Sequence, residues 1–182
     1  MKPKLIILSD IWGKQKSNWI DAYIERLNVK FDVTYYDCCE LGEIDISDYR
    51  QDVLHNQFIK SGIETASKKL VELETENVNI LAFSAGGAIA WKAGLDGLKI
   101  DRFYAVSSTR LRNETKKPNG YLKVYFGSED NFKPETKWYG DLNITYQIIQ
   151  QQNHEMYKQD EIANTICKEI NQLTNISVDT KR

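Results

Sequence analysis

Three residues of types that cooperate in acyl transfer occur far apart in the chain: Ser84, Asp130 and His154. A serine hydroxyl is a weak nucleophile and needs a base that takes its proton. A histidine can accept that proton near neutral pH, and a carboxylate can hold the imidazole in the required tautomer and stabilise its charged form. If the fold brings the three together, they predict nucleophilic catalysis by a serine.

The sequence around Ser84 predicts a sharp turn between a strand and a helix. Val78–Phe83 is a short apolar run bounded by polar residues, as a buried strand would be, and a helical pattern follows the serine. At such a nucleophile elbow the hydroxyl is pushed out of the sheet edge. The residues two before and two after the serine must be small because strand and helix cross there, and Ala82 and Gly86 are small. An ordinary strand-to-helix turn is the plainer interpretation of the same five residues.

The acid and the base each have a competitor. Glu129 precedes Asp130, but a Gly-x-x-Asp pattern after a strand puts the aspartate at the tip of the turn, which favours Asp130 as the acid. The plainer interpretations are a solvated acidic turn for Glu129 and an Asx-turn residue or helix cap for Asp130. Of the two histidines, His154 follows the last predicted strand, where a base would have to lie. His55 falls in a long polar segment and is expected at the surface.

The elements that must position these residues alternate between strand and helix. Strands are predicted at residues 4–8, 31–36, 78–83, 100–106, 121–126 and 143–149. The segment 48–74 predicts a long helix, broken near Ser61–Gly62. Alternation of this kind predicts a parallel sheet with helices on both faces, a three-layer α/β fold. Ligand sites in such sheets form beyond the carboxyl ends of the strands, and Ser84, Asp130 and His154 each follow a strand.

On these residues the chain resembles the α/β-hydrolase superfamily, in particular its small, lid-poor serine hydrolases of the retinoblastoma-binding-protein-9/YdeN type. The resemblance extends from Lys4 to about Leu173 and rests on the stretches AFSAGG, GSED and NHE, which carry the serine, the acid and the histidine. It implies a minimal α/β-hydrolase fold of about six parallel strands, without a lid or N-terminal edge strands. It also implies a catalytic triad with Ser84 as nucleophile, Asp130 as acid and His154 as base.

The oxyanion of a tetrahedral intermediate needs preorganised donors, each worth ~3–4 kcal/mol in enzymes where one was removed. The Ala85 N–H at the helix start is the expected first donor. The second is expected from the loop after the first strand, from the Ile11 N–H or, as second choice, from Trp12. This loop departs from the family, because Ser9-Asp10 stands where His-Gly is common.

The sequence also limits the substrate. Only residues 107–120 separate the fourth and fifth predicted strands, where larger members of the family insert a lid. This length predicts an open site and a small or tethered acyl group. Arg110 lies just beyond a strand end and is a possible substrate-binding residue, since arginine binds carboxylates and phosphates through its forked donors. Trp12 is another. For both, an ordinary solvated or packing role is the plainer interpretation.

Composition excludes several classes of protein. We expect a single domain over residues 1–182 with a polar tail from about residue 174, and 41% hydrophobic residues suffice for a core. A net charge of −2 gives no reason to expect nucleic acid as a partner, and no apolar run approaches the ~20 residues of a membrane span. Three cysteines without paired spacing are expected to be reduced, in the cytoplasm. No cofactor and no metal site are expected.

The predicted function is hydrolysis of a small carboxylic ester or thioester through an acyl-enzyme. Two other classes remain open. One is a hydrolase-fold binding or interaction protein with weak or no catalysis. The other is a doubly wound nucleotide binder in which Ser84–Gly87 holds a phosphate at a helix start. That interpretation leaves Asp130 and His154 unexplained and lacks the usual glycine-rich phosphate motifs. The sequence predicts neither the acyl and leaving groups nor the oligomeric state.

Overall fold

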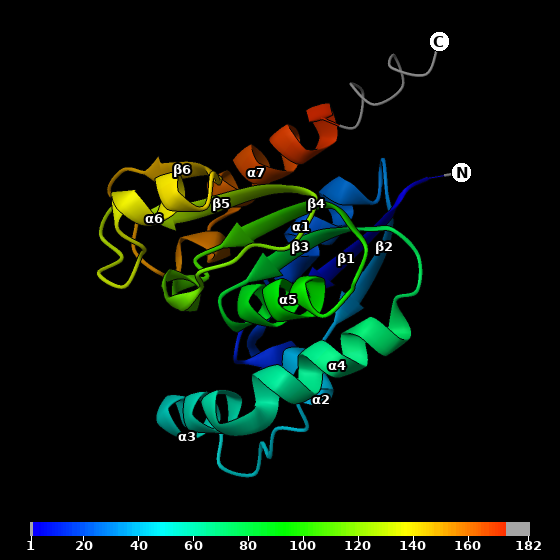
Figure 1. Ribbon diagram of the computed structural model, residues 1–182, viewed down its shortest axis with the longest axis vertical. Helices are drawn as coiled ribbons and strands as arrows, with labels where there is room; N and C mark the ends of the chain where they lie inside the picture. The colour runs from blue at the N-terminus through cyan, green and yellow to red at the C-terminus, as the bar shows by residue number, and fades with distance from the viewer. Residues whose placement is uncertain (1, 174–182) are drawn as a thin grey trace.

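A six-stranded sheet runs through the middle of the molecule, with helices on both of its faces (Figure 1). The structure is a computed structural model that describes residues 2–173. The strand order is β2-β1-β3-β4-β5-β6, and every neighbouring pair is parallel. The strands are β1 (Lys4–Leu8), β2 (Asp32–Tyr36), β3 (Val78–Phe83), β4 (Ile100–Val106), β5 (Tyr121–Gly127) and β6 (Thr145–Ile149). The six predicted strands and their parallel arrangement are confirmed, and the largest shift at a boundary is in β6, which begins at Thr145.

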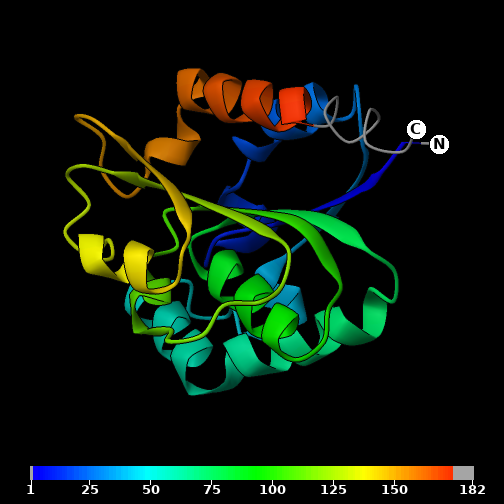
Figure 2. The same cartoon turned by 45° about the horizontal axis from the view of Figure 1, so that its top comes forward.

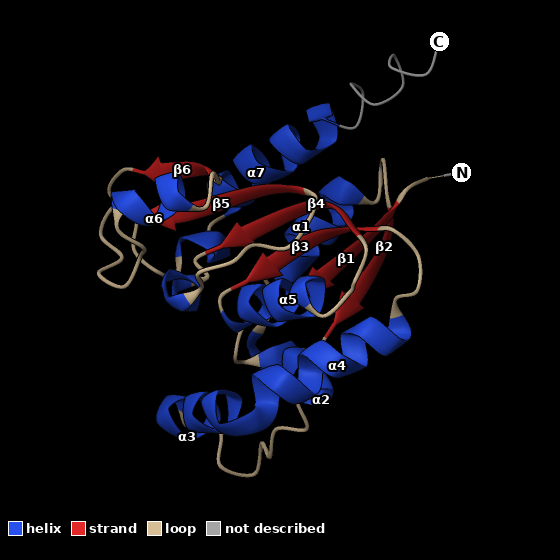
Figure 3. Cartoon of the chain, in the orientation of Figure 1, coloured by secondary structure: helices blue, strands red, loops and turns tan. Residues whose placement is uncertain are grey.

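The inner strands are mostly apolar because both of their faces are covered, as is usual for parallel sheets. In β1, Leu5 and Ile7 belong to one core cluster, whereas Ile6 and Leu8 belong to the cluster on the opposite face. All four side chains are fully buried. All strand arrows run the same way across the twisted sheet (Figure 3), so the carboxyl ends share one edge.

The helices divide between the two faces, as Figure 2 shows. One face is covered by α1 (Ile20–Leu27) and α7 (Asp160–Leu173). The other is covered by α2 (Cys38–Leu41), α3 (Gln51–Gln57), α4 (Ile63–Leu73), α5 (Ala85–Leu95) and α6 (Thr136–Asp141). No helix within residues 2–173 is both long and apolar enough to cross a membrane.

A π-helical turn, Phe58–Gly62, joins α3 to α4. It lies at the break that the sequence predicts near Ser61–Gly62. A Cβ on Gly62 would lie 2.5 Å from Cδ1 of Ile44, so glycine permits this close approach to the loop after α2. Short π-helical segments often occur at functional sites, and this one borders the candidate active site described below.

The connection from β4 to β5 contains a short 3₁₀ turn, Thr109–Asn113, and no helical lid, as the sequence predicts. All three cysteines are buried and unpaired. The polar tail that we expect from about residue 174 lies outside the described residues.

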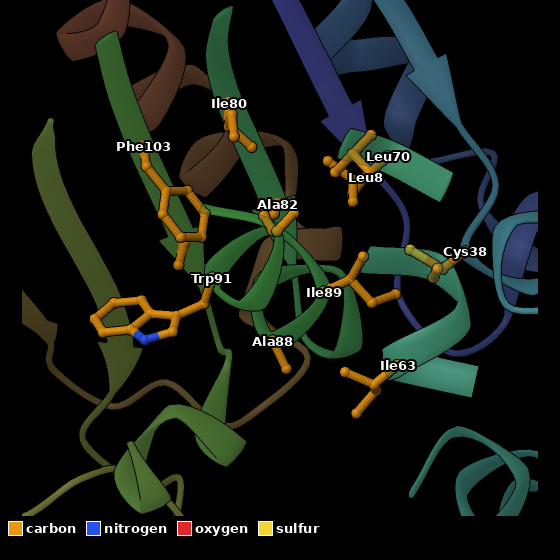
Figure 4. Packing of buried hydrophobic residues seen from close by; sticks show 14 of the residues in the cluster. Leu8, Cys38, Ile63, Leu70, Ile80, Ala82, Ala88, Ile89, Trp91 and Phe103 are labelled. Atoms are coloured by element: carbon orange, nitrogen blue, oxygen red, sulfur yellow. The ribbon is translucent and has the colours of Figure 1, made fainter. Parts of the chain in front are cut away.

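Substitution of Ile89 tests how much of the stability depends on packing against this sheet. It is fully buried on α5, and Figure 4 shows it among Leu8, Cys38 and Ile63. We expect Ile89→Ala to lower the free energy of unfolding by about 2–5 kcal/mol, because the lost methyl groups leave a cavity. Leu73→Ala, at a position that is 56% exposed on α4, should change it by no more than about 0.5 kcal/mol. Urea unfolding measures both, and equal effects would contradict the packing described here.

Candidate active site

Ser84 lies at the turn between β3 and α5, with backbone angles φ 48° and ψ −113°. A positive φ is uncommon for a residue other than glycine and stores strain at the turn. The Ser84 N–H donates to the Val106 carbonyl at 2.9 Å, which fixes the turn to the end of β4. The serine is half-buried and lines a cavity, so it is not closed off from a substrate.

The crossing of strand and helix leaves no room for a side chain at positions 86 and 87. A Cβ on Gly86 would lie 2.5 Å from the Ser9 carbonyl oxygen, and one on Gly87 would lie 1.9 Å from Oγ of Ser108. Both distances are shorter than real Cβ contacts. The requirement for small residues that the sequence predicts at position 86 therefore has a direct cause in the backbone that follows β1.

The structure brings Ser84, His154 and Asp130 together in one chain of contacts. Oγ of Ser84 lies 3.2 Å from Nε2 of His154, and Nδ1 of His154 lies 2.8 Å from Oδ2 of Asp130. With the proton on Nδ1 donated to the carboxylate, Nε2 is left free to accept the hydroxyl proton of Ser84. This is the arrangement that a triad requires.

Asp130 is suited to the acid position by its surroundings. Burial alone would raise its pKa, but hydrogen bonds from His154 and the Phe132 N–H, together with the charges of His154 and Lys133, hold the pKa below its ordinary value. The carboxylate therefore stays ionised at neutral pH. The competing Glu129 is exposed, and its contact in this region is made by its backbone N–H, which donates to the Gln152 carbonyl at 2.9 Å.

The loops that carry Asp130 and His154 are in close contact with each other. A Cβ on Gly127, at the end of β5, would lie 2.1 Å from the Gln152 carbonyl oxygen. The Gln151 N–H also donates to Oγ of Ser128 at 2.9 Å. These contacts tie the loop of Asp130 to the loop of His154, so the distance between the two side chains is set by backbone.

Two backbone N–H groups near Ser84 have no acceptor among the residues that the structure describes. Ala85 begins α5, where the first N–H groups of a helix lack intrahelical partners, and the Ile11 N–H makes no hydrogen bond. The Trp12 N–H is unsuitable as an oxyanion donor because it already donates to Oδ1 of Asp10 at 2.9 Å. Of the two choices that the sequence left for the second donor, Ile11 is therefore the available one.

Asp10 is a fully buried carboxylate in the loop after β1, and the sequence analysis gave it no role. Besides the Trp12 N–H, it accepts a hydrogen bond from the hydroxyl of Tyr157 at 3.0 Å. Burial raises the pKa of Asp10 above its ordinary value, although both hydrogen bonds act in the opposite direction. Tyr157 lies three residues after His154, so Asp10 connects the loop of Ile11 with the segment of the base.

The same loop is also held from α2. The thiol of Cys38 donates to the Ser9 carbonyl at 3.0 Å, and that of Cys39 donates to the Ile11 carbonyl at 3.3 Å. Burial raises the pKa of Cys39 to about 12 and also that of Cys38, so both stay as thiols that can donate. The adjacent cysteines thus help to position the backbone of the loop that contains Ile11. Their spacing in the sequence does not indicate this role.

A small cavity of about 60 Å³ opens beside Ser84. The apolar residues that line it are Ile11, Phe58, Ile59, Ile63 and Ala85. The polar residues that line it, besides Ser84, are His55, Thr109 and Arg110. Arg110, a possible substrate-binding residue from the sequence, is therefore at the site. Trp12 is outside the cavity lining and packs on Tyr49, with ring centroids 5.5 Å apart. His55 is exposed, as expected, yet it borders the cavity.

The sequence missed the wall that comes from α3, the π-helical turn and the start of α4. Its apolar residues have ordinary helical spacing, and nothing in that pattern shows that the segment returns to Ser84. Within residues 2–173 no group of three or more His, Cys, Asp or Glu side chains is placed to hold a metal ion.

The buried carboxylate of Asp10 should make stability depend on pH in a defined direction. The pKa of Asp10 is raised in the folded protein, so its stabilising contribution to the free energy of unfolding is fully present below its ordinary pKa of 3.8. That contribution is lost as the pH rises through the pKa of Asp10 in the folded state. Relative to Asp10→Asn, the native protein should therefore lose stability as the pH rises above the ordinary pKa of Asp10. Urea unfolding of both proteins over a pH series that starts at this value measures the loss, and a difference that does not change with pH would contradict it.

Comparison with known proteins identifies the fold. No protein-family model matches the chain, and no curated protein matches its sequence. Solved structures do match: one from Xanthomonas campestris pv. campestris, assigned to the α/β-hydrolase superfamily, has a TM-score of 0.69 at 12% identity and covers 94% of this chain and 99% of its own.

Two further structures agree. Est1E from Butyrivibrio proteoclasticus, solved with ferulic acid bound, has a TM-score of 0.68 at 12% identity and covers 97% of this chain and 89% of its own. A YdeN-like hydrolase fold from Pectobacterium atrosepticum has a TM-score of 0.55 at 11% identity, with 89% and 92% covered. The resemblance drawn from the sequence is confirmed at the level of architecture: this chain has the fold of the α/β-hydrolase superfamily, in a small form with six parallel strands.

Proposed function

We propose that the protein is a serine hydrolase that cleaves a small carboxylic ester or thioester through an acyl-enzyme. The observation that supports this most is the contact chain from Oγ of Ser84 through His154 to Asp130, with distances of 3.2 and 2.8 Å. Three residues separated by tens of positions in sequence meet in the order and with the spacing that acyl transfer needs. The neighbours in fold that are described as hydrolases agree with this class of reaction.

In the proposed reaction, Oγ of Ser84 attacks the acyl carbon while its proton passes to Nε2 of His154. The carbonyl oxygen becomes an oxyanion and accepts hydrogen bonds from the N–H groups of Ala85 and Ile11. Collapse breaks the bond to the leaving group, which takes the proton from His154. Water then attacks the acyl-enzyme, again with His154 as base, and releases the acid and the free serine.

The cavity limits the acyl group. A single water needs about 10–15 Å³ of such space, so a cavity of about 60 Å³ holds roughly four or five water-sized groups. Pockets for drug-sized ligands are several times larger. We therefore propose short acyl groups as the preferred substrates of this site.

One observation favours the second candidate function, a binding protein with weak or no catalysis. Asp10 precedes Ile11, and a negative charge beside an oxyanion donor opposes the charge that develops in the reaction. The raised pKa of Asp10 favours its neutral form, which carries no charge beside the donor. In the ionised form, its two hydrogen bonds disperse the negative charge. Both effects reduce this opposition. For this reason we place catalysis first.

A fluorophosphonate that reacts with activated serines distinguishes the two functions. We expect one adduct per native chain by intact-mass spectrometry and none on Ser84→Ala, because only the hydroxyl paired with His154 is activated. His154→Gln should slow labelling by a factor of about 100 or more, the size of a general-base contribution. No adduct on a folded native chain would contradict the proposed function and leave the binding protein.

A matched control shows that the adduct is specific. Ser47 is an exposed serine in the loop before α3, and it makes no hydrogen bond with a histidine within the described residues. Ser47→Ala should label as the native protein does. Circular dichroism of each variant establishes that a lost adduct does not reflect a lost fold.

A further inference from the structure

Arg110 differs from the other arginines for which the structure gives contacts. Arg26 is paired with Asp160 and Arg50 with Asp48, both at 2.8 Å. Arg112 donates to the Thr109 carbonyl at 2.8 Å and lies over the ring of Phe132. Arg110 has neither an ion pair nor a hydrogen bond within residues 2–173, although it is half-buried.

This unpaired cation lines the cavity beside the nucleophile. It belongs to the 3₁₀ turn that follows β4, and the cavity lining that it shares includes the buried side chains of Ile11, Phe58 and Ile63. A guanidinium next to apolar side chains is screened less by water than one at an open surface, so it attracts an anion more strongly. Its planar donors match the two oxygens of a carboxylate.

Arg110 also borders a larger groove between α4 and α5, with a volume of about 730 Å³. Charges of both signs line that groove, and Lys68 is already paired there with Glu64 at 2.7 Å. The groove therefore shows no preference for an anion away from Arg110. The apolar cavity at Ser84 is the part of the surface where Arg110 has no competing carboxylate among the lining residues.

We infer that the preferred substrates are esters or thioesters of short dicarboxylic acids, in which the free carboxylate of the acyl group binds Arg110 while the acyl carbon is held at Ser84. This inference rests on the proposed function and names its substrate class. The cavity has room for roughly four or five water-sized groups. One or two methylenes and a carboxylate are of that size, as in malonyl and succinyl groups.

Two esters of similar shape test this. Ethyl hydrogen succinate carries the carboxylate, and ethyl levulinate has a neutral methyl ketone in its place. With the native protein, released ethanol should give a kcat/KM at least about ten times higher for the succinate, the effect of one charge-assisted hydrogen-bonded pair. Arg110→Gln should abolish this ratio, and Arg110→Lys should retain part of it.

Arg112→Gln is the matched control, because Arg112 is two residues away in the same turn and does not line the cavity. It should keep the native ratio. Equal kcat/KM for the two esters with the native protein would overturn the inference, and so would a ratio that survives Arg110→Gln. The comparison of the two esters with the native protein needs no variant. It therefore tests the inference even if a variant fails to fold.

A further substrate pair separates the cavity from the groove. 4-Carboxyphenyl acetate carries its charge on the leaving group, and phenyl acetate is neutral. A preference for the former that Arg110→Gln removes would place the anion in the groove and overturn the inference. If Ser84 reacts with fluorophosphonate and ethyl levulinate is cleaved without any charge preference, only the substrate class is wrong. If neither occurs, the proposed function fails and this inference fails with it.

Discussion

The site depends on two places at the carboxyl edge of the sheet where backbone from different strands comes into direct contact. At Gly86 the start of α5 touches the backbone after β1, and at Gly127 the end of β5 touches the loop after β6. Neither place has room for a Cβ. The first contact sets Ser84 beside the loop of Ile11, and the second sets Asp130 beside His154. The distances between these side chains therefore follow from glycine positions that have no proposed role in the chemistry themselves.

Around these two contacts, buried polar groups fix the loop that carries Ile11, which we propose as the second oxyanion donor. Asp10 joins it to Tyr157, and the thiols of Cys38 and Cys39 join it to α2. Each buried donor or acceptor that loses its partner costs about 1–3 kcal/mol, so the loop has few alternative conformations. A histidine and a glycine are common at this place in the family that the sequence resembles, whereas this chain holds the loop with a carboxylate and two thiols.

Much of this could be predicted from sequence because the signals were local. Apolar runs set the strands, the small residues around Ser84 set the turn, and the order of Ser84, Asp130 and His154 pointed to one chemistry. What could not be predicted depends on contacts between distant segments. The cavity wall from Phe58 to Ile63 arises where a π-helical turn meets the sheet edge. The roles of Asp10 and the two cysteines arise from hydrogen bonds that cross 28 or more positions.

In the proposed reaction, Ser84 carries the acyl group during turnover. The most direct measurement is intact-mass spectrometry of the native protein, quenched with acid within the first turnover of 4-nitrophenyl butyrate, followed by peptide mapping. An activated ester acylates quickly, so the intermediate accumulates before water releases it. We expect a mass increase of one butyryl group, located on the peptide that contains Ser84. Release of nitrophenolate without an acylated chain, or with the acyl group on another residue, would contradict it.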